Sequence, residues 1–124
     1  FVDGSRLGVM NTDDFARSGL KPDFATQSGP MLVINGEIHP KFSETGASAK
    51  SRKGVGQLDE QTAVFVISDD AVNFYSFAEF FRDGLGSRNA LFLDGTVSSL
   101  YSPELGRTMN FVPLGPMVGA LKLQ

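Results

Sequence analysis

The sequence contains no cysteine and one histidine, His39, among its 124 residues. Without thiols there are no disulfide bonds and no thiolate metal sites, and one imidazole is a poor basis for a transition-metal site, so we expect no metal and no cofactor. No apolar run approaches the roughly 20 residues of a membrane-spanning helix. Positive charge is scarce as well, since 11 Lys and Arg stand against 14 Asp and Glu, for a net charge of −3. This balance argues against a nucleic-acid partner, which requires a basic face.

What remains is the composition of an ordinary globular protein, with 41% hydrophobic and 20% charged residues. The length predicts a single domain over residues 1–124. Residues 1–11 predict a hairpin around Asp3-Gly4 that begins in mid-strand. Because an intact domain rarely begins there, we expect part of a larger domain. Its open edges would pair in a homodimer or with a missing N-terminal segment.

The pattern of apolar runs predicts several short strands and one main helix. Asp13 and Asp14 follow Thr12 in a short helix that Gly19 closes, and Asn35-Gly36 predicts a tight hairpin. We expect a polar surface loop over residues 41–51 and a central strand, covered on both faces, at the β-branched run 63–67. The other predicted strands cover residues 24–26, 31–34, from 55 onward, 90–93 and 117–121.

The clearest helix signal is SFAEFFRDGLG, in which Ser76 and Glu79 form a capping box. Phe77, Phe80 and Phe81 fall on one face, which predicts a helix that covers a sheet. The expected fold class is therefore α+β, with a mixed, mostly antiparallel sheet packed by one amphipathic helix. The link from this helix to the strand at 90–93 allows one parallel neighbour.

The segment NALFLDGTVSSLY delivers a carboxylate, Asp94, from a buried strand to a turn of small residues. Strand ends are common places for functional groups, and Gly95 would let a ligand come close. Thr96, Ser98 and Ser99 add hydroxyls. The alternative is an Asp-Gly turn that caps a short helical turn at 98–101.

Two further stretches carry candidate binding groups. Arg52 and Lys53 precede Gly54, and with two nearby lysines they suit an anion such as phosphate, or else form a solvated basic loop. The turn Gln27-Ser28-Gly29-Pro30 offers an amide and a hydroxyl to a sugar, or else is a bend before a proline. A serine hydrolase is discounted, because no nucleophile elbow is present.

These segments, taken in order, resemble the phosphodiester glycosidase family, which includes the lysosomal uncovering enzyme and bacterial members associated with exopolysaccharide. The resemblance rests on FATQSGPMLVINGEIHPKF, RKGVG, VNFYSFAEFFRDGLGSRNALFLDGTVSSLY and GPMVGALK. It implies hydrolysis of a sugar-1-phosphodiester between sugar and phosphate, in the periplasm or outside the cell.

Residue by residue, the resemblance places Arg52 on the family's arginine, Asp94-Gly95 on its aspartate-glycine, and residues 27–30 on its small-residue turn. It implies Asp94 on the sugar side and Arg52 on the phosphate side, with Asp94 as nucleophile, base or ion-pair partner of Arg52. The bacterial pattern usually has Asn where Lys53 stands. The family's N-terminal half, with an Asn-Gly or Ala-Gly motif, has no match here, so the chain resembles the C-terminal half. The competing expectations are a non-catalytic module for anionic glycans and an inactive fragment.

Overall fold

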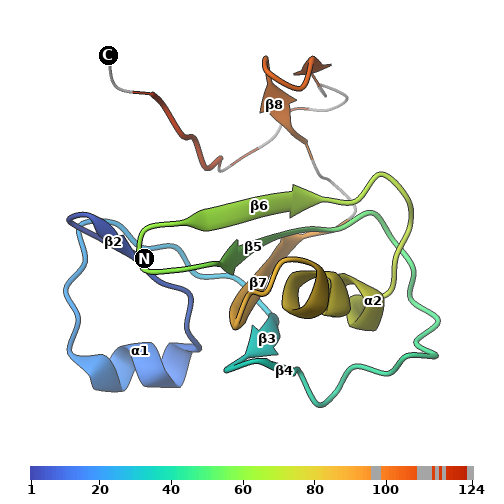
Figure 1. Cartoon of the computed structure of the whole chain (residues 1–124), viewed down its shortest axis with the longest axis horizontal. Coiled ribbons are helices and arrows are strands. Elements are labelled where there is room, and N and C mark those ends of the chain that lie inside the picture. Colours follow the sequence, from blue (N-terminus) through green and yellow to red (C-terminus); the bar gives the residue numbers. More distant parts are fainter. Residues whose placement is uncertain (96–98, 109–112, 114, 116, 123–124) are drawn as a thin grey trace.

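A five-stranded antiparallel sheet organises the protein, whose computed structural model describes residues 1–95, 99–108, 113, 115 and 117–122 (Figure 1). The strand order is β4-β3-β7-β5-β6, and the described strands pair antiparallel throughout, so the parallel neighbour that the sequence allowed is not formed. The α+β class is confirmed. The strands are β3 (Met31–Ile34), β4 (Glu37–Ile38), β5 (Lys53–Gln57), β6 (Ala63–Ile67) and β7 (Asn89–Asp94).

One face of this sheet is covered by α2 (Phe74–Glu79), which continues as a π-helical turn, η1 (Phe80–Gly84). The helix begins earlier than predicted, because the Asn73 side chain accepts the Ser76 N–H at 2.8 Å and so takes the capping role expected of Ser76. The helix and the sheet share a core of fully or nearly fully buried side chains: Leu32, Val33, Phe77, Ala78, Phe81 and Ala90.

Glycines in β5 let the helix approach this closely. A Cβ on Gly54 would lie 3.2 Å from the Phe77 and Phe81 rings, and one on Gly56 would lie 2.7 Å from the Phe81 ring. The expectation for Phe80 is wrong, since it is 49% exposed at the margin of the buried stripe that Phe77 and Phe81 form.

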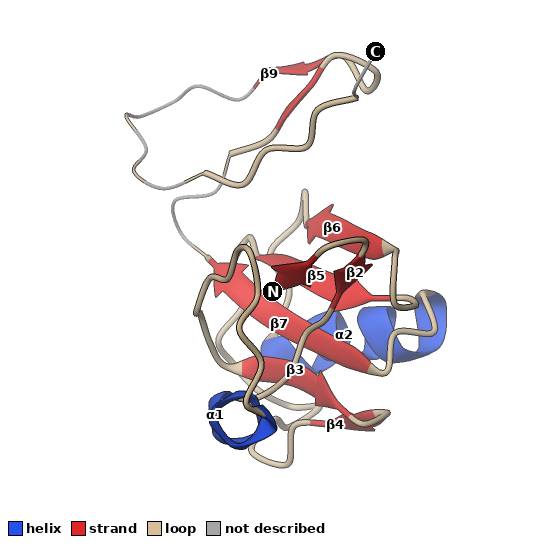
Figure 2. Cartoon of the chain, turned by 90° about the vertical axis from the view of Figure 1, so that its left-hand side faces the viewer, coloured by secondary structure: helices blue, strands red, loops and turns tan. Residues whose placement is uncertain are grey.

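The N-terminal segment lies against the opposite face of the sheet from α2 (Figure 2). It contains the predicted hairpin, β1 (Val2–Asp3) and β2 (Arg6–Leu7), and then α1 (Thr12–Ser18), which Asn11 caps. Its Val9 N–H donates to the Gln57 side chain at 3.0 Å, which ties the segment to β5. The strand expected at 24–26 is reduced to one bridge between Phe24 and Val2.

Two expectations about strands are wrong. Within the described residues β6 is an edge strand, and its Phe65 is 52% exposed. A β-branched run encodes a strand but not its place in the sheet. Residues 117–121, expected as a last strand, form no regular structure.

The C-terminal part contains a second hairpin, β8 (Tyr101–Ser102) and β9 (Arg107–Thr108), so residue 101 is in a strand and not in a helical turn. Arg107 donates to both carboxylate oxygens of Asp69 at 2.6 and 2.8 Å, and this pair joins the hairpin to the end of β6.

Burial predicts different costs for two neighbouring rings. Phe81→Ala should lower the free energy of unfolding by about 3–5 kcal/mol, because the ring is fully buried against Gly54 and Gly56. Phe80→Ala, the matched control, should cost about 1 kcal/mol or less, since half of the ring is exposed. Urea unfolding of both variants measures the difference, and similar losses would mean that the helix face is assigned wrongly.

The Arg107 hydrogen bonds lower the pKa of Asp69 below its ordinary value. A folded-state pKa below the unfolded one stabilises the attachment at higher pH, and this contribution is lost as the pH falls through the folded pKa. Arg107→Gln should therefore raise the Asp69 pKa toward that of a free aspartate. NMR titration of the carboxyl carbon measures it, and an unchanged midpoint would mean that the pair does not hold the hairpin in solution.

Candidate functional site

Most of the candidate site residues meet at one end of the β5–β7 pair. Lys53 begins β5 directly opposite Asp94, which ends β7. The Ser28 hydroxyl donates to the carbonyls of Phe92 and Leu93 at 2.8 and 3.1 Å, so the predicted sugar-binding turn does lie beside the end of β7. Thr96 and Ser98 lie outside the described residues.

The Arg52 guanidinium is buried, so the expectation of a solvated basic loop is wrong for this residue. Its Nε donates to the Val72 carbonyl at 2.8 Å and its Nη2 to the Ser48 carbonyl at 2.7 Å. The guanidinium carbon lies 3.6 Å from the centre of the Phe74 ring and 5.6 Å from that of Phe92. Within the described residues no carboxylate pairs with it. Burial lowers the pKa of Arg52, but an arginine stays protonated throughout the physiological range.

Aromatic rings extend this cluster away from the sheet. Phe42 stacks on Phe74 with ring centres 4.8 Å apart and planes within 10°, and Phe92 meets Phe74 edge-on at 5.0 Å. His39 packs on Phe42 at 5.0 Å, which gives the single histidine a packing role beside this stack. Sequence reasoning did not connect these rings with Arg52, because they come from three separate segments and no spacing rule relates them.

A register shift decides which way Asp94 points. Gly54 pairs with Phe92, so a regular ladder would place Asp94 opposite Arg52. The ladder instead shifts by one residue, and Asp94 comes opposite Lys53, whose Nζ lies 4.0 Å from Oδ2 of the carboxylate. Of the roles left open for Asp94, the ion pair with Arg52 is therefore not formed.

The two catalytic candidates consequently lie on different faces of the sheet. Gly54 faces α2, and Arg52, two residues earlier, contacts Phe74 on that same face. Lys53 faces away from the helix, and Asp94 lies beside it. A ligand that touched both candidates would have to pass around the end of the β5–β7 pair.

Four other candidates lie less favourably for binding. The Gln27 amide donates to the Thr12 hydroxyl on α1 at 3.0 Å. Gly54 serves the close packing of α2 and not an approach by ligand. Gly29 is exposed and precedes a cis proline. Gly95 is buried, and a Cβ there would contact the Phe92 ring at 3.4 Å.

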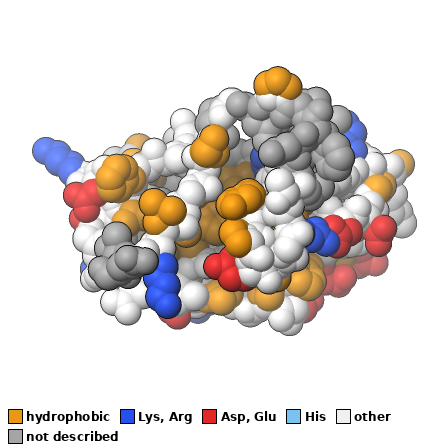
Figure 3. Space-filling view, turned by 90° about the horizontal axis from the view of Figure 1, so that it is seen from above, with side chains coloured by type: hydrophobic (Ala, Val, Ile, Leu, Met, Phe, Trp, Pro, Cys, Tyr) orange, Lys and Arg blue, Asp and Glu red, His pale blue; other side chains and the backbone are white. Residues whose placement is uncertain are grey.

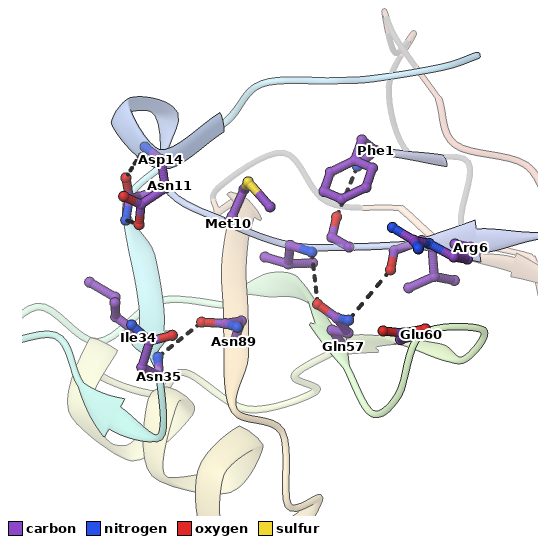
Figure 4. Close-up of a pocket in the computed structure, with 13 residues that line it drawn as sticks. Phe1, Arg6, Met10, Asn11, Asp14, Ile34, Asn35, Gln57, Glu60 and Asn89 are labelled. Carbon is purple, nitrogen blue, oxygen red and sulfur yellow. Dashed lines mark hydrogen bonds between the residues drawn. The ribbon is translucent and has the colours of Figure 1, made fainter. Parts of the chain in front are cut away.

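A pocket of about 280 Å³ lies at the other end of the same strands (Figure 4). It opens between the N-terminal segment and the sheet, and its lining includes Phe1, Met10, Asn35, Gln57 and Asn89. Arg52 and Asp94 do not line it, so the hollow and the candidate chemistry do not coincide. Among the residues that the structure describes, no cluster of His, Asp and Glu could hold a metal ion, and no helix is long and apolar enough to cross a membrane.

Comparison with known proteins supplies the family. The model of the phosphodiester glycosidase family matches residues 3–111, which is most of the chain. The chain belongs to the phosphodiester glycosidase family. A curated relative from Escherichia coli (strain K12), named uncharacterized protein YigE, is 42% identical over 101 residues. The match covers 82% of this chain but 39% of that relative. No solved structure matches.

The contacts of Arg52 predict that its removal strongly destabilises this domain. Arg52→Ala should lower the free energy of unfolding by about 1.5–3 kcal/mol for each of the two charge-assisted hydrogen bonds lost. Lys53→Ala is the control, since its pair with Asp94 is partly exposed and should contribute about 1 kcal/mol or less. Urea unfolding separates them, and equal effects would mean that the Arg52 contacts do not stabilise the fold.

Proposed function

We propose that this chain is the C-terminal part of a phosphodiester glycosidase domain that hydrolyses a sugar-1-phosphodiester between sugar and phosphate. The observation that carries the proposal is the family match over residues 3–111. We further propose that Asp94 serves the sugar side of the reaction and Arg52 the phosphate side. As the resemblance implies, the natural setting would be the bacterial periplasm or the exterior, with an anionic exopolysaccharide or related glycan as substrate.

The state of Arg52 supports an anion-binding role. A guanidinium has five N–H donors, and two of its nitrogens donate to the Val72 and Ser48 carbonyls. Carbonyls are neutral acceptors, so the positive charge is not cancelled by a described partner. A cation held in one orientation in a poorly solvated place attracts a phosphate oxygen more strongly than an exposed one does.

The chemistry requires little acid catalysis. Water adds to the anomeric carbon and loses one proton to a carboxylate or to solvent, the bond from that carbon to the bridging oxygen breaks, and the electron pair leaves with the phosphate monoester. Because this leaving group is already stable as an anion, its protonation matters less than in an ordinary glycosidase. One carboxylate and one guanidinium could therefore suffice.

One observation favours the second candidate, an anionic-glycan binding module or an inactive fragment. Asp94 is 55% exposed at its side chain and pairs with Lys53, on the face opposite Arg52. In this arrangement Asp94 and Arg52 do not converge on one reacting bond. We propose that the remaining part of the longer protein, supplied in the same chain or by association, closes the site.

Measured turnover decides between the hydrolase and the binding module. The longer protein that contains this domain should release sugar from a sugar-1-phosphodiester, and Asp94→Asn should lower kcat/KM by at least about a hundredfold through loss of the carboxylate. Asp69→Asn, which removes a carboxylate outside the site, is the control and should keep the activity. Binding of the diester without any turnover by the parent protein would favour the binding module.

A further inference from the structure

The outer edge of β6 offers a row of backbone groups for pairing. The Ser68 N–H donates to the Arg52 carbonyl at 2.8 Å, and the Leu58 N–H donates to the Thr62 carbonyl at 2.9 Å. Hydrogen-bonded positions alternate along an antiparallel ladder, so the backbone N–H and C=O groups of Val64 and Val66 also point toward β5. The N–H and C=O groups of the remaining residues therefore point outward: Ala63, Phe65 and Ile67.

This edge lacks the features that usually protect one. It contains no charged residue and no proline, and its ladder with β5 runs in regular register from Ala63 to Ile67. Within the described part of the chain, β5 is its one strand neighbour. Phe65 is half exposed on the face away from α2. Figure 3, which looks down on the protein from the side of the C-terminal segment, shows hydrophobic side chains exposed at several places. An apolar edge of this kind pairs with another strand when one is within reach.

An apolar segment of the same chain is exposed on this side of the molecule. Met117, Val118 and Leu121 are 87%, 61% and 91% exposed and belong to no strand. In an extended conformation Met117 and Leu121 would share one face and Val118 would take the other. In Figure 1 the red C-terminal segment lies beyond β6, away from α2 and the rest of the sheet.

The Arg107–Asp69 pair holds the chain that leads to residues 117–121 near Ile67, at the end of β6. Asp69 lies two residues after Ile67, the last residue of β6, and holds the hairpin there with two hydrogen bonds. The nine residues from 108 to 116 can span up to roughly 30 Å, and the five residues of β6 are about 17 Å long. A chain that enters at Ile67 and runs toward Ala63 is antiparallel to β6.

We propose that Met117–Leu121, which form no regular structure in the conformation described above, move onto the outer edge of β6 and pair there as an antiparallel sixth strand of the same molecule. Docking would satisfy the outward backbone groups of Ala63, Phe65 and Ile67 and would cover the Phe65 ring with an apolar side chain. The proposal concerns a contact between two parts of this chain and does not depend on the proposed hydrolysis.

Cysteine cross-linking tests the contact directly, because the chain has no cysteine of its own. Phe65→Cys is combined in turn with a cysteine at each of positions 117–121 and oxidised in dilute solution. At least one of these five cysteine pairs should form a disulfide within a monomer, and peptide mass mapping identifies it. Glu37→Cys, exposed on β4 at the far edge of the sheet, is the matched control and should not cross-link. Cross-linking no faster than this control, or a disulfide-linked dimer, would overturn the proposal.

Hydrogen exchange gives a second readout that does not need a fixed register. The outward amides of Phe65 and Ile67 should be protected, and Val118→Pro should speed their exchange by about tenfold or more by removing a strand donor. The inward amides of Val64 and Val66 serve as the internal control and should keep their rates. Outward amides that exchange as fast as exposed coil in the unaltered chain would contradict docking.

Discussion

The buried guanidinium of Arg52 is the contact on which this domain depends. It contacts parts of the chain that belong to different elements. These are the loop at Ser48, the turn at Val72, the start of α2 at Phe74 and the Phe92 ring of β7. Burying a charge is costly, and two carbonyl acceptors and an aromatic face offset that cost. Lysine would carry the charge but lacks the planar fork that donates in two directions while it stacks, so the position requires arginine.

The same contact fixes a division between the two faces of the sheet. Arg52 is committed to the face that α2 covers, and the register shift in β7 turns Asp94 to the other face, beside Lys53. Shifts of this kind redirect a side chain without changing the strand. A register shift of one residue thus separates two groups that a regular ladder would have brought opposite each other.

These features also mark the limit of prediction from sequence. Strands at Met31 and Asn89, the Asn35-Gly36 turn and the helix around Phe77 follow from local patterns, and the structure confirms them. The family match confirms the resemblance that the ordered motifs indicated. The edge position of β6, the exposure of Phe80 and the shift at Asp94 depend on which elements meet in space, and no local pattern carries that information. The burial of Arg52 was missed for the same reason, since a cation before two glycines gives the same signal whether it is solvated or stacked.

The physical demands of the proposed hydrolysis indicate what the rest of a longer protein would contribute. Asp94 is more than half exposed and the Lys53 pair is solvated, so water screens the charge that would act on the sugar. Electrostatic stabilisation of a charged transition state is strong only where water is excluded and donors are already oriented. Arg52 meets that condition by its burial, and Asp94 does not. The missing contribution is therefore cover over the face that carries Lys53 and Asp94, the same face against which the N-terminal segment packs further along β5. A partner element that continued that packing toward Asp94 would exclude water from the carboxylate and leave the Arg52 side of the sheet unchanged.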